Sequence, residues 1–164
     1  MNNELVVRNA VVKDIPRILE LLIQVNHVHA VGRPDLFTDG KRKYEEEDLK
    51  KILKDRDRPI FVCTKDDLVI GYCMAEIIYA KKGRSEVPRK DLYIDDLCVD
   101  ENIRKSGAGT ALYNYAKDFA AEIGCYSMTL HVWDCNPGAR AFYEKVGMRP
   151  YMTAMETIIG SKKN

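Results

Sequence analysis

The sequence of 164 residues lacks the features that mark membrane-spanning and nucleic-acid-binding proteins. No apolar run approaches the roughly 20 residues that a membrane-spanning helix needs. The 26 lysines and arginines nearly balance the 25 aspartates and glutamates, and a formal net charge of +1 argues against a dedicated nucleic-acid surface. We therefore expect neither a membrane nor a nucleic acid as a partner.

The spacing of the cysteines shows no pairing motif. The five cysteines are odd in number, and none belongs to a C-x-x-C pair, so neither a zinc site nor a disulfide framework is indicated. They are Cys63, Cys73, Cys98, Cys125 and Cys135. The first residues, MNNELVVRNAVVKD, lack the basic head and apolar stretch of a secretory signal. These observations predict reduced thiols, no metal, and a cytoplasmic location.

Internal repeats, low-complexity tracts and linkers rich in proline, glycine or serine are also missing. The length suits one domain that buries a core of its own. We assign residues 1–160 to that single domain and expect 161–164, which are short, polar and terminal, to form a flexible tail.

Hydrophobic periodicity predicts six strands and four helices in the order βααβββαβαβ. The expected strands are 5–8, 59–64, 68–80, 92–99, 127–132 and 150–159, and the expected helices are 15–25, 44–55, 112–123 and 139–146. Strand, helix and strand in succession imply a parallel pair, whereas the hairpin around 65–67 implies antiparallel neighbours. The fold class is therefore α/β, with one mixed, mostly antiparallel sheet and helices on both faces.

A basic, glycine-rich corner stands where the third helix begins, directly after a strand. Backbone N–H groups at a helix start carry partial positive charge and suit a pyrophosphate when no side chain blocks them. Gly107 and Gly109 remove that block, and Arg104 and Lys105 add charge. The alternative is a tight turn with solvated basic residues. A Walker loop is absent, and a dinucleotide fingerprint would need glycine where Leu112 stands.

Two motifs in this half of the chain resemble those of the GNAT superfamily of N-acetyltransferases. The spacing Arg104-x-x-Gly107-x-Gly109 is similar to the acetyl-CoA signature of that superfamily. Its second motif, N-x-x-A-x-x-F-Y-x-x-x-G-[FM], matches Asn136, Ala139, Phe142, Tyr143, Gly147 and Met148. The chain departs in having Asp100-Glu101-Asn102 where many members have a proline, and Lys105 where many have glycine.

The resemblance implies a splayed parallel strand pair that binds acetyl-CoA. Leu97, Cys98 and Val99 would hydrogen-bond the pantetheine arm, and Asn136 would do so from the opposite side. The diphosphate would be held by Arg104, Lys105, Ser106, Gly107, Ala108, Gly109 and Thr110. For the strand, an ordinary buried segment is the alternative, and for Asn136 it is a helix N-cap before Pro137.

The resemblance also implies direct attack of a primary amine on the thioester. Tyr143 would protonate the leaving thiolate, unless it is only a core residue beside Phe142. Asp95 would serve as base or attract the cationic amine. Strand alternation predicts that Asp95 shares a face with Leu97 and Val99, with Asp96 on the other face. Asp96 could replace Asp95, or both could be structural.

Other readings stay open at this point. A sensor that binds acyl-CoA without turnover and a nucleotide-binding domain are the competing functions. His27, His29 and His131 are favoured as surface or core histidines because no partner set accompanies them. Residues 31–37 would help to form the acceptor site, whose amine could belong to a small molecule or a protein. The alternating strand at 150–159 predicts an exposed edge where a homodimer could form.

Overall fold

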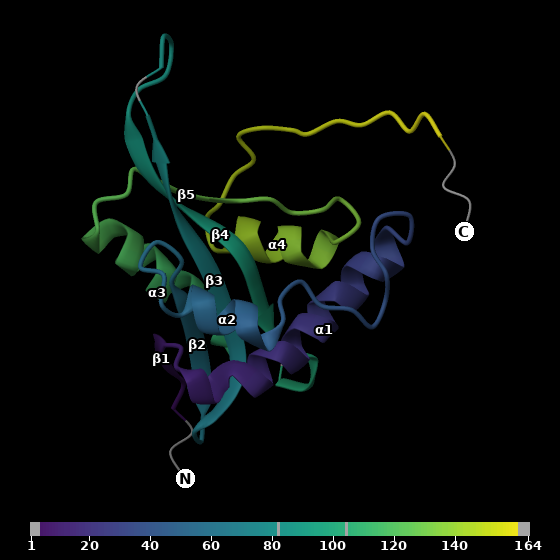
Figure 1. Ribbon diagram of the computed structural model, residues 1–164, viewed down its shortest axis with the longest axis vertical. Coiled ribbons are helices and arrows are strands. Elements are labelled where there is room, and N and C mark those ends of the chain that lie inside the picture. Colours follow the sequence, from purple (N-terminus) through teal and green to yellow (C-terminus); the bar gives the residue numbers. More distant parts are fainter. Residues whose placement is uncertain (1–3, 82, 104, 161–164) are drawn as a thin grey trace.

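The computed structural model describes residues 4–81, 83–103 and 105–160, so the predicted tail at 161–164 and Arg104 lie outside the described residues. Five strands form one sheet in the order β1-β2-β3-β4-β5 (Figure 1). They are β1 (Val6–Asn9), β2 (Ile60–Lys65), β3 (Leu68–Ala80), β4 (Arg89–Val99) and β5 (Ser127–Leu130). Neighbours are antiparallel except β4 and β5, which are parallel. The predicted mixed, mostly antiparallel sheet is confirmed.

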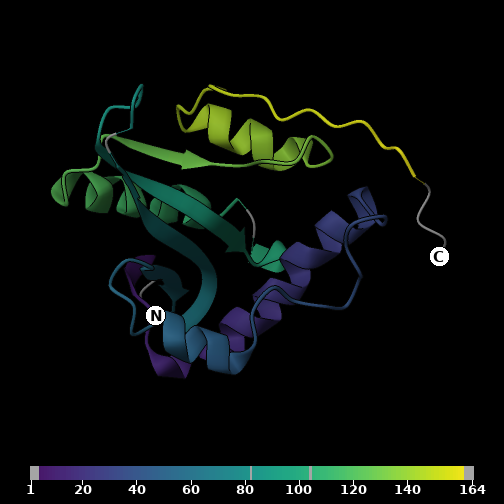
Figure 2. The ribbon, with the colours of Figure 1, turned by 45° about the horizontal axis from the view of Figure 1, so that its top comes forward.

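Helices cover both faces of this sheet (Figure 2). One face carries α1 (Ile15–Gly32) and α2 (Glu46–Ile52), and the other carries α3 (Ala108–Glu122) and α4 (Pro137–Lys145). The short 3-10 helices η1 (Val12–Asp14) and η2 (Glu101–Ile103) precede α1 and α3. No helix in the described parts of the chain is long and apolar enough to cross a membrane.

Alternation along the central strands divides the core in two. Tyr72 and Met74 of β3 pack with Ile18 and Leu22 of α1 on one side. Cys73, between them, packs on the other side with residues of α3. Because β2 and β3 are covered on both faces, their sequences read as nearly continuous apolar runs. β4, the neighbour of β3, also contributes side chains to both layers.

The predicted last strand is wrong. Residues 150–159 form no strand, and every residue from 151 to 160 is exposed. We call residues 150–160 the C-terminal arm; it passes α4 and extends beyond it (Figure 1, Figure 2). Glu156 in the arm pairs with Arg33, the residue after α1, at 2.5 Å. Alternation shows that a segment suits a sheet, but it does not show that a strand edge lies within reach.

Candidate active site

The parallel pair separates halfway along β4. The β4–β5 ladder runs from Asp91–Ser127 to Ile94–Leu130 and stops there. On its other side β4 stays paired with β3 as far as Val99, opposite Gly71. Residues 95–99 therefore have an open backbone edge on the β5 side, in the middle of the molecule. Leu97, Cys98 and Val99, the residues expected beside a pantetheine arm, lie on this open stretch.

A β-bulge marks the start of the open stretch. Met74 pairs with Asp96 and Ala75 with Ile94, which leaves Asp95 without an opposite residue. A bulge re-aims side chains, and bulges are common beside active sites. The prediction that Asp95 shares a face with Leu97 and Val99 is wrong for this reason. Leu97 and Val99 pack on the α3 side, whereas Asp95 turns to Tyr44 on the α1–α2 side.

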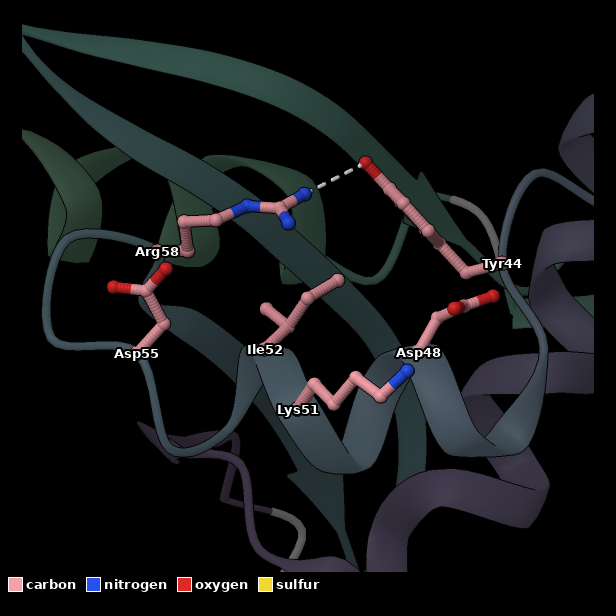
Figure 3. Close-up of a pocket in the computed structure, with 6 residues that line it drawn as sticks. All are labelled: Tyr44, Asp48, Lys51, Ile52, Asp55 and Arg58. Atoms are coloured by element: carbon pink, nitrogen blue, oxygen red, sulfur yellow. Dashed lines mark hydrogen bonds between the residues drawn. The ribbon is translucent and has the colours of Figure 1, made fainter.

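Asp95 is held by two partners from the loop before α2. Its Oδ1 accepts from Lys43 Nζ at 2.5 Å, and its Oδ2 accepts from the Tyr44 hydroxyl at 2.7 Å. Tyr44 in turn accepts a hydrogen bond from Arg58 at 3.0 Å, in a pocket that also includes Asp48, Lys51, Ile52 and Asp55 (Figure 3). Both carboxylate oxygens of Asp95 are thus engaged, which ties the loop to β4.

Asp96 lies in a different environment. The hydroxyl of fully buried Tyr72 donates to its Oδ2 at 2.7 Å. Burial raises the pKa of Asp96 to about 6; the bond from Tyr72 opposes this rise, and the neighbouring Asp95 adds to it. A carboxylate with such a pKa can both accept and release a proton near neutral pH.

Tyr143 of α4 is near enough to Asp96 for the carboxylate to affect its pKa. Burial is the main cause that raises the pKa of Tyr143, and the nearby Cys73, Asp96 and Cys98 raise it further. The ring lies 5.2 Å from that of Phe142, which packs on the α3-side core. The hydroxyl therefore stays protonated at neutral pH, in the electrostatic neighbourhood of Asp96.

Asn136 caps α4. Its side-chain Oδ1 accepts from the Ala139 backbone N–H at 3.1 Å, and Pro137 occupies the first turn. The alternative role of helix cap is therefore confirmed. Because the cap uses only the oxygen, the side-chain NH₂ can still donate to another group.

The loop before α3 has an unusual backbone. Lys105 and Gly107 both have positive φ, 65° and 88°. Ser106 Oγ accepts from the Ala108 N–H at 3.4 Å, and Lys105, Ser106, Gly107 and Thr110 are exposed. Alternation of ordinary and left-handed residues turns successive N–H groups to one side, which forms an anion-binding nest. The backbone at this helix start therefore has the conformation of such a nest, at residues that are mostly exposed.

The two sequence motifs meet at Gly109. A Cβ built there would lie 3.3 Å from two ring carbons of Phe142 and 3.7 Å from Val99. At Gly107, by contrast, a Cβ would meet only Leu5 Cδ1, at the ordinary contact distance of 3.9 Å. The lack of a side chain at Gly109 thus allows α4 to pack on the first turn of α3. This contact sets the position of Tyr143, the next residue after Phe142.

Residues of α1 that the sequence did not single out stabilise the end of β4. Gln24 donates to the Val99 carbonyl at 3.0 Å and accepts from the Glu101 N–H at 3.1 Å. Arg17 pairs with Asp100, which also accepts from the backbone N–H of Asn102. No local pattern marks these polar residues, because each of them acts across more than 70 positions of sequence.

The three histidines are placed elsewhere. His27 pairs with Asp39 at 2.9 Å, and His131 shares a hydrogen bond with the Tyr93 hydroxyl at 3.0 Å. His29 packs against Phe37, and burial lowers its pKa. Among the residues that the structure describes, no three His, Cys, Asp or Glu side chains gather in a metal-ligand group.

The loop after α1 closes against the segment before α4. Phe37 contacts the Trp133 ring edge-on at 5.6 Å, and the Arg33 guanidinium lies 5.8 Å from the same ring. Residues 31–37, expected at the acceptor site, thus lie beside the segment that follows β5.

Comparison with known proteins agrees with this geometry. A family model described as the acetyltransferase (GNAT) family matches residues 25–148. An uncharacterized N-acetyltransferase of Methanocaldococcus jannaschii is 27% identical over 86% of this chain, and YhfO of Bacillus subtilis, named likewise, is 32% identical over 60%. The matches cover 59% and 64% of those two proteins, so the chain spans about three fifths of their length.

Solved structures share the fold. A mutant of the BH1408 protein from Bacillus halodurans superposes with a TM-score of 0.90 at 25% identity, over 94% of this chain and 99% of that one. A glucosamine-6-phosphate N-acetyltransferase from Arabidopsis thaliana superposes with a TM-score of 0.68 at 20% identity, over 96% and 99% of the two chains.

Proposed function

The chain belongs to the acetyltransferase (GNAT) family, and from this premise we propose that it is an acetyl-CoA-dependent N-acetyltransferase that acts on a primary amine. The observation that carries the proposal is the open edge of β4 at residues 95–99, with Asp96 on it and Tyr143 facing it from α4. A central strand with an unpaired edge, beside a carboxylate and a phenol hydroxyl that can exchange protons, suits a ligand that binds as an extra strand.

The residues around this edge fit the parts of acetyl-CoA. The pantetheine arm contains amides that can pair with those backbone groups of Leu97–Val99 that face away from β3, and the Asn136 NH₂ can donate to it. The exposed, left-handed turn at Lys105 and Gly107 and the Lys105 ammonium suit the diphosphate. When bound, acetyl-CoA supplies an activated acetyl group as a thioester and leaves as a thiol.

We favour Asp96 over Asp95 as the proton acceptor. Asp95 is bonded to the cation Lys43 and to Tyr44, whereas the donors to Asp96 are neutral, the Tyr72 hydroxyl and the Leu97 backbone N–H. A free amine is mostly protonated at neutral pH, with a reference pKa of about 10. Asp96, whose pKa is raised to about 6, is ionised at pH 7 and can take that proton directly or through water.

Tyr143 is the proton donor in this proposal. Its raised pKa keeps the proton on the hydroxyl, where it is available to a thiolate as the thiolate forms. A positioned general acid contributes roughly 10²–10⁴-fold to the rate. The acceptor, a small-molecule or protein amine, would enter beside the loop at 33–45, where the carboxylates of Asp95 and Asp96 favour a cation.

The test is thiol release from acetyl-CoA in the presence of a panel of amines, measured together with acetyl-CoA binding by calorimetry. We expect thiol release with at least one amine, and its loss in Tyr143→Phe and Asp96→Asn. Tight binding without thiol release for any amine would indicate a sensor. Absence of acetyl-CoA binding would refute the proposal and favour the nucleotide-binding alternative.

A further inference from the structure

Lys43 brings an amine of the chain itself to the candidate active site. It lies in the loop between α1 and α2, and its Nζ donates to Asp95 Oδ1 at 2.5 Å. Asp95 is the extra residue of the β-bulge at which the open edge of β4 begins. Lys43 thus presents to this carboxylate the chemical group that the proposed acceptor, a primary amine, would also present.

Electrostatic coupling links Lys43 to the groups proposed to move protons. Burial lowers the pKa of Lys43, but Asp95 and, more weakly, Asp96 raise it above its usual value. Burial raises the pKa of Asp96, and the charge of Lys43 opposes that rise. Burial likewise raises the pKa of Tyr143, and Asp96 adds to it. Because interactions between charges weaken with distance, Asp96 lies near both the Lys43 amine and the Tyr143 hydroxyl.

The bond between Lys43 and Asp95 can be exchanged for other contacts. The lysine side chain is 51% exposed, against 17% for the aspartate, so the amine reaches the carboxylate from the solvent side. Ion pairs with an exposed partner are weak, and the lysine side chain is long and flexible. Lys43 also lies outside α2, which begins at Glu46, so no helix fixes its backbone. The amine can therefore move from Asp95 toward the open edge of β4.

We propose that Lys43 is acetylated by the active site of its own molecule when acetyl-CoA is bound and no other amine is supplied. Its Nζ forms a bond to the acetyl carbonyl carbon while the bond from that carbon to sulfur breaks. The Lys43 ammonium gives up two protons in all: one ends on the departing thiolate and one passes to water, with Asp96 as acceptor and Tyr143 as donor. The products are an acetylated lysine without charge and the thiol of CoA. The inference rests on the proposed function, because it uses the same two groups.

The first experiment locates acetyl groups on the whole chain by peptide mass spectrometry after incubation with acetyl-CoA alone. Lys41, two positions earlier in the same loop and also exposed, is the internal control. We expect acetylation at least about tenfold faster at Lys43 than at Lys41, since only Lys43 is served by a general acid. Tyr143→Phe should slow acetylation of Lys43 at least about tenfold and leave that of Lys41 unchanged. Equal rates at the two lysines, or no effect of Tyr143→Phe, would overturn the proposal.

Acetic anhydride gives a readout that needs neither acetyl-CoA nor catalysis. This reagent acetylates lysines from solution according to the fraction of each amine that is unprotonated. Although burial lowers the pKa of Lys43, Asp95 raises it overall, so Lys43 should react more slowly than Lys41. The order of the two lysines should thus reverse between acetic anhydride and acetyl-CoA. A Lys43 that reacts faster with both reagents would show intrinsic reactivity and overturn the proposal.

A mixing experiment separates transfer within one molecule from transfer between molecules. Isotope-labelled Tyr143→Phe is incubated with unlabelled wild type and acetyl-CoA, and only the unlabelled chains should be acetylated at Lys43. Acetylation of Lys43 to the same extent in both chains would mean transfer between molecules and would overturn the proposal.

Thiol release distinguishes failure of this inference from failure of the proposed function. Without added amine, Lys43→Arg should lose thiol release although arginine keeps a cation beside Asp95, whereas Lys41→Arg should retain it. Thermal melts that match wild type confirm that both variants are folded. Thiol release with an added amine but no acetyl group on Lys43 would overturn the inference alone. Absence of acetyl-CoA binding would overturn the inference and the proposed function together.

Discussion

Replacement of Asp96 by asparagine should make the protein more stable at neutral pH while it removes activity. Asp96 is ionised at pH 7 although its surroundings disfavour the charge, since burial raises its pKa from 3.8 to about 6. At about 1.4 kcal/mol for each tenfold change, this rise corresponds to roughly 3 kcal/mol of destabilisation above pH 6. Asparagine avoids the charge, and its carbonyl oxygen can still accept from the Tyr72 hydroxyl.

The sign of the pH dependence follows from proton binding. Between pH 3.8 and about 6 the folded state binds the proton of Asp96 more tightly than the unfolded state does, so this group lowers stability as pH rises through that window. We therefore expect Asp96→Asn to exceed wild type by about 1–3 kcal/mol at pH 7, and the difference to vanish near pH 4.

Urea unfolding at pH 7 and pH 4, followed by circular dichroism, measures both differences. Asp95→Asn is the matched control: it removes the ion pair with Lys43 and should lower stability, by about 1 kcal/mol. If Asp96→Asn is less stable than wild type at pH 7, or if its gain is the same at pH 4, the carboxylate is not held in a disfavoured charged state and the reasoning fails.

Three further variants test the rest of the site. Tyr143→Phe should lower kcat by roughly 10²–10⁴-fold and leave acetyl-CoA affinity nearly unchanged; equal losses in both would remove its assigned role. Tyr72→Phe removes the bond that lowers the pKa of Asp96, so the acidic limb of the pH–rate profile should move upward from about 6, and an unmoved limb would exclude Asp96 as the base. Gly71→Ala places a Cβ 2.8 Å from the Cys98 carbonyl oxygen and should cost about 1–3 kcal/mol in urea unfolding, whereas unchanged stability would show that β3 and β4 can separate.

The sequence predicted the elements that depend on local pattern. The helical periods at 15–25 and 112–123, the hairpin at 65–67 and the parallel pair all lie where expected. Gly107 and Gly109 were predicted as one feature, but the structure gives them different roles. Gly107 supplies a left-handed backbone, and Gly109 makes room for Phe142.

Features that depend on distant contacts could not be read in this way. The bulge at Asp95 shifts the alternation by one residue, and nothing in the local sequence YIDDLCV indicates where the extra residue falls. The pairing of Tyr72 with Asp96 joins two strands, and that of Lys43 with Asp95 joins a loop to a strand. The arm is not a strand although its pattern is that of one, because alternation does not place a strand edge beside it.

The early end of the β4–β5 ladder also leaves a strand edge that could promote aggregation, and charged residues lie beside it. From residue 95 onward β4 has no strand on its β5 side, although Gln24 donates to the Val99 carbonyl, and an unpaired strand edge is a template on which foreign peptides can anneal into aggregates. Asp95 and Asp96 are the first residues of this stretch, and charged residues at an open strand edge oppose pairing with an apolar peptide. The two aspartates proposed to act in proton transfer would thus also protect the protein from aggregation. Replacing both by asparagine should make the protein more prone to form fibrils.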